Sequence, residues 1–315
     1  MRGLHLVPAG IDVSFISKRL IFFVFSAALA LASVGLFLSK GLNYGIDFQG
    51  GIMIEVRTPE AANIGDMRKT LGSLGLGEVA LQEFGQPTDV LIRIQRQPGG
   101  EEAQDAAVKK IHDTLGAKVE YRRTEFVGPK VSDELFWDGI MAVGLAILAI
   151  LAYIWFRFEW QFGFGAVVAL SHDVISTIGI FALLGLEFNL STVAAILTIA
   201  GYSINDTVVV YDRVRENLRK FKKLPLSEVL NNSINQTLSR TVMTSVTTLL
   251  ALLALFFLGG EVIRDFSFAM IWGVIIGTYS SICLAVPLLI YLNIDRGGAM
   301  VEGLSDEEAA AKEAP

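Results

Sequence analysis

The stretch LIFFVFSAALALASVGLFL, residues 20–38, runs for 19 residues without a charged side chain. A helix needs about 17–25 apolar residues to cross the hydrocarbon core of a bilayer. Five further stretches with little or no charge follow, at residues 139–156, 161–186, 188–205, 241–260 and 266–294. The 315-residue chain is 52% hydrophobic and only 18% charged, whereas a soluble domain carries about 25% charge. The pattern excludes a purely soluble or disordered protein and predicts a polytopic α-helical membrane protein with six transmembrane helices.

We expect five parts along the chain. Their predicted bounds are 1–19 for a cytoplasmic tail, 20–39 for helix 1, 40–135 for a polar region, 136–294 for helices 2–6, and 295–315 for a disordered tail. The last five helices are expected at about 136–156, 162–184, 188–210, 240–259 and 266–292. The first apolar run is longer than the roughly 7–15 residues of a signal-peptide core, so we expect a retained anchor.

The orientation follows from the basic residues that flank the spans. Arg2, Lys18 and Arg19 precede the first span. Six basic residues are expected between spans four and five: Arg213, Arg215, Arg219, Lys220, Lys222 and Lys223. The short connection between spans three and four, residues 185–189, has no basic residue. Because basic residues concentrate in cytoplasmic loops, both termini are expected in the cytoplasm and the polar region on the exported side.

The polar region alternates between strand-like and helical patterns. Strands are expected over 51–58, 79–84, 90–96 and 118–126, and helices over 64–74 and 101–115. This βαββαβ order predicts a small α+β ferredoxin-like exported domain after helix 1. The fold supports many functions, so it does not identify one.

Several function classes lack support in the sequence. The net charge is −6 and the basic residues lie beside the spans, which does not favour nucleic-acid binding. The single cysteine, Cys283, excludes an intramolecular disulfide. No HExxH, Walker A or GxSxG motif is present, so hydrolytic chemistry lacks support. We expect no enzymatic activity and no bound metal or cofactor.

Three places within the spans carry charges that a bilayer disfavours, and such residues are functional candidates. The first is Asp173 in span three, which follows His172. Two interpretations remain open for it. Asp173 is either a neutral structural group that is hydrogen-bonded to His172 or to a neighbouring helix, or part of a proton or conformational relay.

The second place is Asp206 in span four, which follows Asn205. At 100° per residue, one polar stripe covers an arc of about 140° on this helix; it comprises Thr198, Gly201, Tyr202, Asn205 and Asp206. Such a stripe is expected to face protein or a water-filled cavity. In the alternative interpretation, Asp206 only marks the end of the helix, since Asp212 follows soon.

The third place is Arg240, at the start of span five, with Thr244, Thr247 and Thr248 at helical spacing behind it. Spans four and five run antiparallel, so the geometry permits a pair between Asp206 and Arg240. The guanidinium stays charged, whereas the carboxyl can gain and lose a proton. Alternatively, Arg240 extends its side chain to the membrane interface.

The segment GIDFQGG, residues 45–51, follows the first span. Gly45, Gly50 and Gly51, together with Asp47 and Phe48, predict a tight connection into the first strand. A phosphate-binding loop is not expected, because no Lys-Ser/Thr pair follows on a helix.

Together these segments resemble the SecD/SecF family of the resistance-nodulation-division superfamily. The likeness rests on GIDFQGG (45–51), residues 158–163 with Ser171, His172 and Asp173, GYSINDTVVVYDRVREN (201–217) and NNSINQTLSRTVMTS (231–245). It extends over nearly the whole chain.

The resemblance implies a proton-driven accessory role in protein export across the bacterial inner membrane, without a cofactor. It implies pairing with SecD and association with the SecYEG channel, with YajC and YidC, and with unfolded preproteins. The family's proton-handling aspartate falls on Asp206 and its basic partner on Arg240, while a further essential aspartate belongs to SecD. In the resulting hypothesis, protonation of Asp206 weakens its pairing with Arg240, and the motion passes through residues 45–51 to the exported domain.

Two other functions are weighed against this one. A small-molecule or lipid exporter of the same superfamily is disfavoured, because about 95 residues form only one small lobe, whereas drug exporters carry larger ones. A passive scaffold of the translocon predicts that neutral replacements at Asp206 and Arg240 are harmless.

Overall fold

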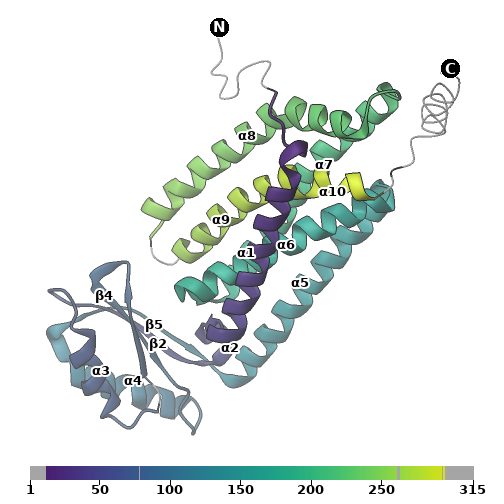
Figure 1. Cartoon of the computed structure of the whole chain (residues 1–315). Coiled ribbons are helices and arrows are strands. Elements are labelled where there is room, and N and C mark those ends of the chain that lie inside the picture. Colours follow the sequence, from purple (N-terminus) through teal and green to yellow (C-terminus); the bar gives the residue numbers. More distant parts are fainter. Residues whose placement is uncertain (1–11, 78, 261–262, 293, 295–315) are drawn as a thin grey trace, which may run out of the picture.

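The computed structural model describes residues 12–77, 79–260, 263–292 and 294. Within these ranges, long apolar helices form a bundle, and a smaller α+β lobe lies at one end of it (Figure 1). Six helical segments are long and apolar enough to cross a membrane: Ile16–Lys40, Lys130–Arg157, Trp160–Leu184, Leu190–Lys220, Leu226–Leu258 and Arg264–Tyr291. The prediction of a polytopic α-helical membrane protein is therefore confirmed. The predicted tail 295–315 and most of the tail 1–19 lie outside the described residues.

The bundle is built from eight helices of the described chain and short irregular turns. The first five long ones are α1 (Arg19–Lys40), α5 (Pro129–Arg157), α6 (Trp160–Leu184), α7 (Leu190–Lys220) and α8 (Leu226–Leu258). A 3₁₀ turn, η1 (Ile16–Lys18), precedes α1. The last span is composite: α9 (Arg264–Ser280), the π-helix η4 (Ser281–Ala285), α10 (Val286–Leu288) and the 3₁₀ turn η5 (Leu289–Tyr291). The remaining short helix, α2 (Ile46–Gln49), follows α1.

Helices α7 and α8 extend well beyond the predicted bounds of 188–210 and 240–259. Four of the six basic residues expected in a loop lie in α7 instead, and only Lys222 and Lys223 lie in the connection. A change from apolar to polar residues does not by itself end a helix. The polar C-terminal part of α7 packs against α8 through Asn217, whose Nδ2 donates to Ser233 Oγ at 2.9 Å. Pro225 lacks a backbone N–H, and α8 begins directly after it.

The lobe consists of β2 (Gly51–Arg57), α3 (Ile64–Gly72), β3 (Val79–Phe84), β4 (Gln86–Ile94), α4 (Glu101–Leu115), the 3₁₀ turn η2 (Gly116–Lys118) and β5 (Glu120–Val127). The sheet order is β3-β4-β2-β5, and all pairings are antiparallel. In the register, Ile52 lies opposite Ile94 of β4 and Phe126 of β5. The largest departure from the predicted elements is β4, which starts at residue 86 rather than 90.

The two faces of this sheet pack against different parts of the molecule. Ile52 and Ile54 belong to the core that the sheet shares with α3 and α4, together with Leu71 and Ile111. The opposite face carries Met53 and Leu91, which cluster with Ile46 of α2. Side chains alternate between the faces of a strand, so the second face of the sheet turns toward α2 and the bundle.

A second, two-stranded sheet links distant parts of the bundle. Strand β1 (Asn43–Tyr44), just after α1, pairs in parallel with β6 (Glu187–Phe188), which lies between α6 and α7. The end of the first span is thereby held beside the start of the fourth, at the end of the bundle that carries the lobe (Figure 1).

Candidate functional site

Asp206 lies in the middle of α7, 16 residues after its first residue and 14 before its last. The interpretation of Asp206 as the end of the helix is therefore wrong. Its side chain is 3% exposed, and no described residue donates a hydrogen bond to its Oδ2. A buried polar atom without a partner costs free energy, so Oδ2 is open to a proton or to a donor that moves toward it.

Arg240 lies on the neighbouring helix α8, exposed at the surface of the chain. Within the described residues, its guanidinium makes no hydrogen bond or ion pair, and no contact of 4.0 Å or less joins it to Asp206. Arg240 is nevertheless the charged side chain whose electrostatic field acts on Asp206. The adjacent Thr241 is buried, and its Oγ1 also lacks a partner among the described residues. The two predicted partners are thus neighbours that are not in contact.

Three of the five residues of the predicted polar stripe of α7 lie at the surface of this chain, whereas Asp206 is buried. Thr198, Gly201 and Asn205 are exposed, whereas Tyr202 is half-buried and donates to Ser245 of α8 at 3.5 Å. Helix α8 adds the exposed side chains of Arg240, Thr244 and Thr247. Because polar groups are rare on lipid-facing helices, this surface is typical of one that another protein covers.

Asp173 lies fully buried on α6, with a relative exposure of 0%. Its Oδ2 accepts hydrogen bonds from Ser203 of α7 at 2.6 Å and from Ser280 of α9 at 2.7 Å. Its Oδ1 lies 3.0 Å from His172 Nδ1. One carboxyl group therefore joins three helices, as the structural interpretation of Asp173 requires, while its part in a relay stays a prediction.

His172 packs against Tyr279, which is hydrogen-bonded to α1. The side chain is buried, and its Nε2 has no partner among the described residues. Its ring centroid lies 6.2 Å from that of Tyr279. The Tyr279 hydroxyl donates to the carbonyl of Phe22 at 2.9 Å and lies 3.0 Å from Ser26 Oγ, both in α1.

The face of α7 near Asp206 also packs on the π-helix η4. Ser281 Oγ lies 2.8 Å from Thr207 Oγ1 and donates to the carbonyl of Ser203 at 3.3 Å. Single turns of π-helix are rare and are frequent at functional sites. Asp206 therefore lies on a helix whose neighbour departs from regular α geometry at the same level.

Asp47 ties the GIDFQGG segment to α7. Its Oδ2 accepts a hydrogen bond of 2.9 Å from the backbone N–H of Leu190, the first residue of α7. Gly45 N donates to the carbonyl of Phe188 at 2.9 Å. A carboxylate at a helix N-terminus is also favoured by the helix dipole. The helix that carries Asp206 therefore begins on the segment that leads into the lobe.

Gly51 and Phe48 are closely packed at the other end of this connection. Gly51 has φ 117°, and a Cβ there would lie 2.6 Å from the carbonyl oxygen of Ile94, so the close approach of β4 requires glycine. The Phe48 ring contacts Tyr44, Phe136 and Phe188, with centroids 6.0–6.3 Å apart. The predicted tight connection thus contains the four-residue helix α2, wedged between the bundle and β2.

Arg93 and Glu187 form a second link between lobe and bundle that the sequence did not suggest. Arg93 Nη2 lies 2.9 Å from Glu187 Oε2, and Nη1 donates to Asn43 Oδ1 at 2.8 Å. Burial raises the pKa of the Glu187 carboxyl, while the charge of Arg93 acts against this shift. Glu187 is the one charged residue in the connection 185–189, which is the only sequence signal that distinguishes it.

Comparisons with known proteins place these features in a family. The family model described as "Protein export membrane protein SecD/SecF, C-terminal" matches residues 107–295, and that of the "SecD/SecF GG Motif" matches residues 35–58. The first match covers more than half of the chain. The chain belongs to the SecD/SecF family.

Within the SecD/SecF family, the chain is of the SecF type. It is 49% identical to the protein translocase subunit SecF of Rickettsia rickettsii, over 91% of this chain and 94% of that protein. It is 47% identical to the SecF subunit of Rhodobacter capsulatus, over 93% and 92% of the two chains. The resemblance stated from the motifs is therefore confirmed.

Solved SecDF structures share the fold. The crystal structure of SecDF from Thermus thermophilus matches with a TM-score of 0.82 and 39% identity, over 90% of this chain and 39% of that one. A crystal structure of SecDF in a Super-membrane-facing form matches with a TM-score of 0.65 and 36% identity, over 96% and 40%. The chain spans about two-fifths of SecDF.

Proposed function

We propose that this chain is an accessory subunit of the bacterial Sec protein translocase and couples the proton gradient to preprotein export. The observation that carries the proposal is Asp206, a buried carboxyl in the middle of a membrane-spanning helix, whose Oδ2 has no partner among the residues that the structure describes. The start of that helix is bonded to the segment that enters the lobe. Within this proposal, the lobe is a ferredoxin-like domain on the exported side of the inner membrane, and both termini are cytoplasmic.

The proposed partner within the membrane is SecD. The exposed polar stripe of α7 and α8 supports this pairing, because a second membrane protein would shield it from lipid. The SecDF proteins that match this chain are more than twice its length, which leaves room there for a second half. We further propose association with SecYEG, and with YajC and YidC, as the family resemblance implies.

The proposed cycle begins with a proton on Asp206. A neutral Asp206 no longer attracts the guanidinium of Arg240, so α7 and α8 change their packing. The displacement of α7 reaches β2 through Asp47 and Gly45. One proton crossing a potential of ~150 mV releases ~3.5 kcal/mol, which shifts a two-state equilibrium about several hundred-fold.

Asp173 has a different part in this proposal. Its hydrogen bonds to α7 and α9 hold the centre of the bundle together. We assign it the role of a fixed point against which the ends of α7 and α8 move. His172 then orients Asp173. Asn205 faces the proposed partner SecD.

The experiment is gradient-dependent export by proteoliposomes that contain SecYEG, SecD and this chain. Asp206→Asn is expected to abolish the part of export that needs the proton gradient and to leave the ATP-driven part intact. Asp212→Asn is the matched control, because Asp212 lies on the same helix but is 44% exposed and paired with Arg157. Normal gradient-dependent export by Asp206→Asn contradicts the proposal and supports the passive scaffold.

A further inference from the structure

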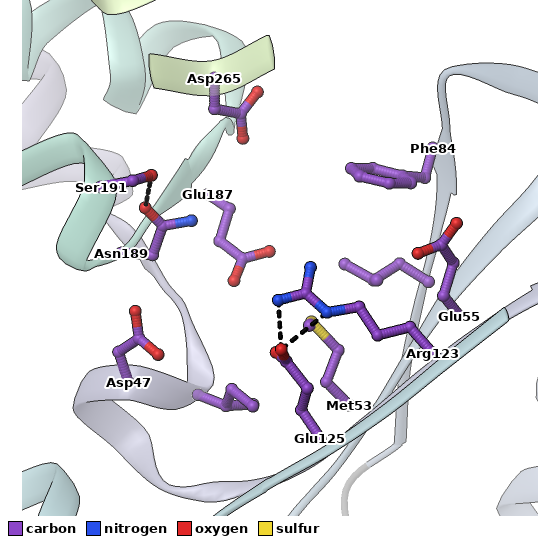
Figure 2. Close-up of a pocket in the computed structure, with 12 residues that line it drawn as sticks. Asp47, Met53, Glu55, Phe84, Arg123, Glu125, Glu187, Asn189, Ser191 and Asp265 are labelled. Atoms are coloured by element: carbon purple, nitrogen blue, oxygen red, sulfur yellow. Dashed lines mark hydrogen bonds and ion pairs between the residues drawn. The ribbon is translucent and has the colours of Figure 1, made fainter. Parts of the chain in front are cut away.

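A pocket with a cavity volume of about 160 Å³ lies between the lobe and the bundle. Figure 2 shows Glu187 entering it from the bundle side and Arg123 from the sheet opposite. Five carboxylates line the pocket: Asp47, Glu55, Glu125, Glu187 and Asp265. Arg123 is the one basic residue among the lining residues that the structure describes. The pocket therefore carries an excess of negative charge.

The carboxylates differ in how well they are paired. Glu125 pairs with Arg123, Glu187 with Arg93, and Asp47 accepts from the backbone of Leu190. Glu55 on β2 is only 8% exposed, and no described residue forms a hydrogen bond or ion pair with it. Its carboxylate oxygens are not among the fully buried polar atoms, so they are accessible from the pocket that Glu55 lines. A cation that enters the pocket would supply the missing partner.

The rest of the lining is apolar. Ile46, Met53 and Leu91 form one buried cluster, and Phe84 packs against it. An arginine or lysine side chain combines an apolar stem with a charged tip, and an aromatic face such as that of Phe84 attracts a cation. A cavity of roughly 150 Å³ accepts a benzene-sized group, so this pocket has room for a guanidinium and part of its stem.

A metal ion fits the pocket less well. Within the part of the chain that the structure describes, no group of three or more His, Cys, Asp or Glu side chains is arranged to hold a metal. Asp47, Glu187 and Asp265 enter the pocket from the bundle side, whereas Glu55 and Glu125 lie on the sheet opposite (Figure 2). This spacing suits an elongated organic cation.

We propose that this pocket binds an arginine or lysine side chain presented by an extended polypeptide on the exported side of the membrane. The basic side chain follows from the pocket itself. The polypeptide and its side of the membrane rest on the proposed function. Glu55 pairs with the charged tip, and the cluster of Ile46, Met53 and Leu91 packs on the stem.

The test is binding of a fluorescent Gly/Ser peptide with one central arginine to the full chain in nanodiscs, measured by anisotropy. Replacing that arginine by glutamine is expected to weaken binding at least about tenfold, because a hydrogen bond to a charged group contributes about 1.5–3 kcal/mol. Glu55→Gln is expected to cause a loss of the same size. Glu83→Gln is the matched control, since Glu83 is an exposed acid of the same sheet outside the pocket.

Each other outcome has a defined meaning. Equal affinity of Glu55→Gln and the parent chain, or of the two peptides, overturns the proposal. If free arginine amide binds as tightly as the peptide, the pocket takes small organic cations and the polypeptide part is wrong. Should Glu55→Gln fail to fold, Asp265→Asn provides a second removal of charge from the same pocket and is expected to weaken binding. Peptide binding in nanodiscs needs no proton gradient, so failure here is distinct from failure of proton coupling.

Discussion

Asp173 and Asp206 are both buried acids in membrane-spanning helices, yet their surroundings differ at the level of single atoms. The carboxyl of Asp173 contacts two serine hydroxyls and an imidazole, whereas Oδ2 of Asp206 has no partner among the described residues. A carboxyl that accepts several hydrogen bonds is held in place by them. A carboxyl oxygen without a donor can accept a proton or a hydrogen bond from a group that moves toward it. The two residues should therefore fail in different ways when they are replaced.

Asp173→Ala is expected to lower the free energy of unfolding by at least about 2 kcal/mol, because it leaves the buried Ser203 hydroxyl without its acceptor and removes one of the two acceptors of the Ser280 hydroxyl. Asp206→Asn is expected to change it by less than about 0.5 kcal/mol, since no hydrogen bond to Oδ2 is lost. Thermal unfolding in detergent, followed by tryptophan fluorescence, compares the two. Equal destabilisation would contradict the separate roles.

Asp89 in the lobe provides a pH-dependent test. Arg57 donates to both of its oxygens, at 2.5 and 2.6 Å, and these hydrogen bonds lower the pKa of Asp89. The stabilisation is complete above the unfolded pKa of about 3.9 and is lost as the pH falls through the lower folded value. At neutral pH, the amides of β2 and β4 should be better protected against hydrogen exchange in the parent chain than in the Asp89→Asn variant. This difference should shrink near pH 3; a constant difference would contradict the assignment.

At the scale of elements, the start of α7 is the place where bundle and lobe meet. Asn189 caps the helix locally, through a capping box with Thr192. Asp47 adds a bond from a segment that lies 143 residues away in the sequence. The capping box of Asn189 sets where α7 begins. The hydrogen bond from Asp47 attaches this start to the segment that leads into the lobe.

Asp47→Ala is expected to reduce gradient-dependent export more than Asp47→Asn. Asparagine keeps an acceptor for the Leu190 N–H and loses only the charge at the helix terminus, worth about 0.3–1 kcal/mol. Hydrogen exchange in the first turn of α7 should rise in the alanine variant. Identical export by both variants would show that this bond does not transmit motion.

Local pattern predicts much of this molecule. The apolar runs indicated the six spans because length and lack of charge are properties of single segments. The polar extensions of α7 and α8 could not be predicted in the same way, since their stability comes from contacts such as that of Asn217 with Ser233. Asp206 and Asp173 were noticeable as charges in apolar runs. Arg93 was not, because its partner Glu187 lies 94 residues away.

At the scale of the whole molecule, the exposed polar stripe of α7 and α8 is not packed against another part of the described chain. Gly201 belongs to it, and a Cβ at this position would meet no atom within 4 Å. Gly35 of α1 is likewise exposed and free of such contacts. The two glycines therefore form a matched pair, one on the polar stripe and one on an apolar helix.

Gly201→Leu is expected to fold normally and to abolish co-purification with SecD, because the side chain projects where the partner would pack. Gly35→Leu should leave the complex intact. The measurement is the amount of SecD retained with the tagged chain in mild detergent. Retention of SecD by Gly201→Leu would place the partner on another face.

The bond between Asp47 and Leu190 also orders events during biosynthesis. At about 5–20 residues per second, the 143 residues that separate them take about 7–30 s to emerge from the ribosome. The strands and helices that the structure describes in the lobe are complete by residue 127, long before Leu190 is synthesised. The hydrogen bond between the segment before the lobe and the fourth span can therefore form only after the whole lobe has been synthesised.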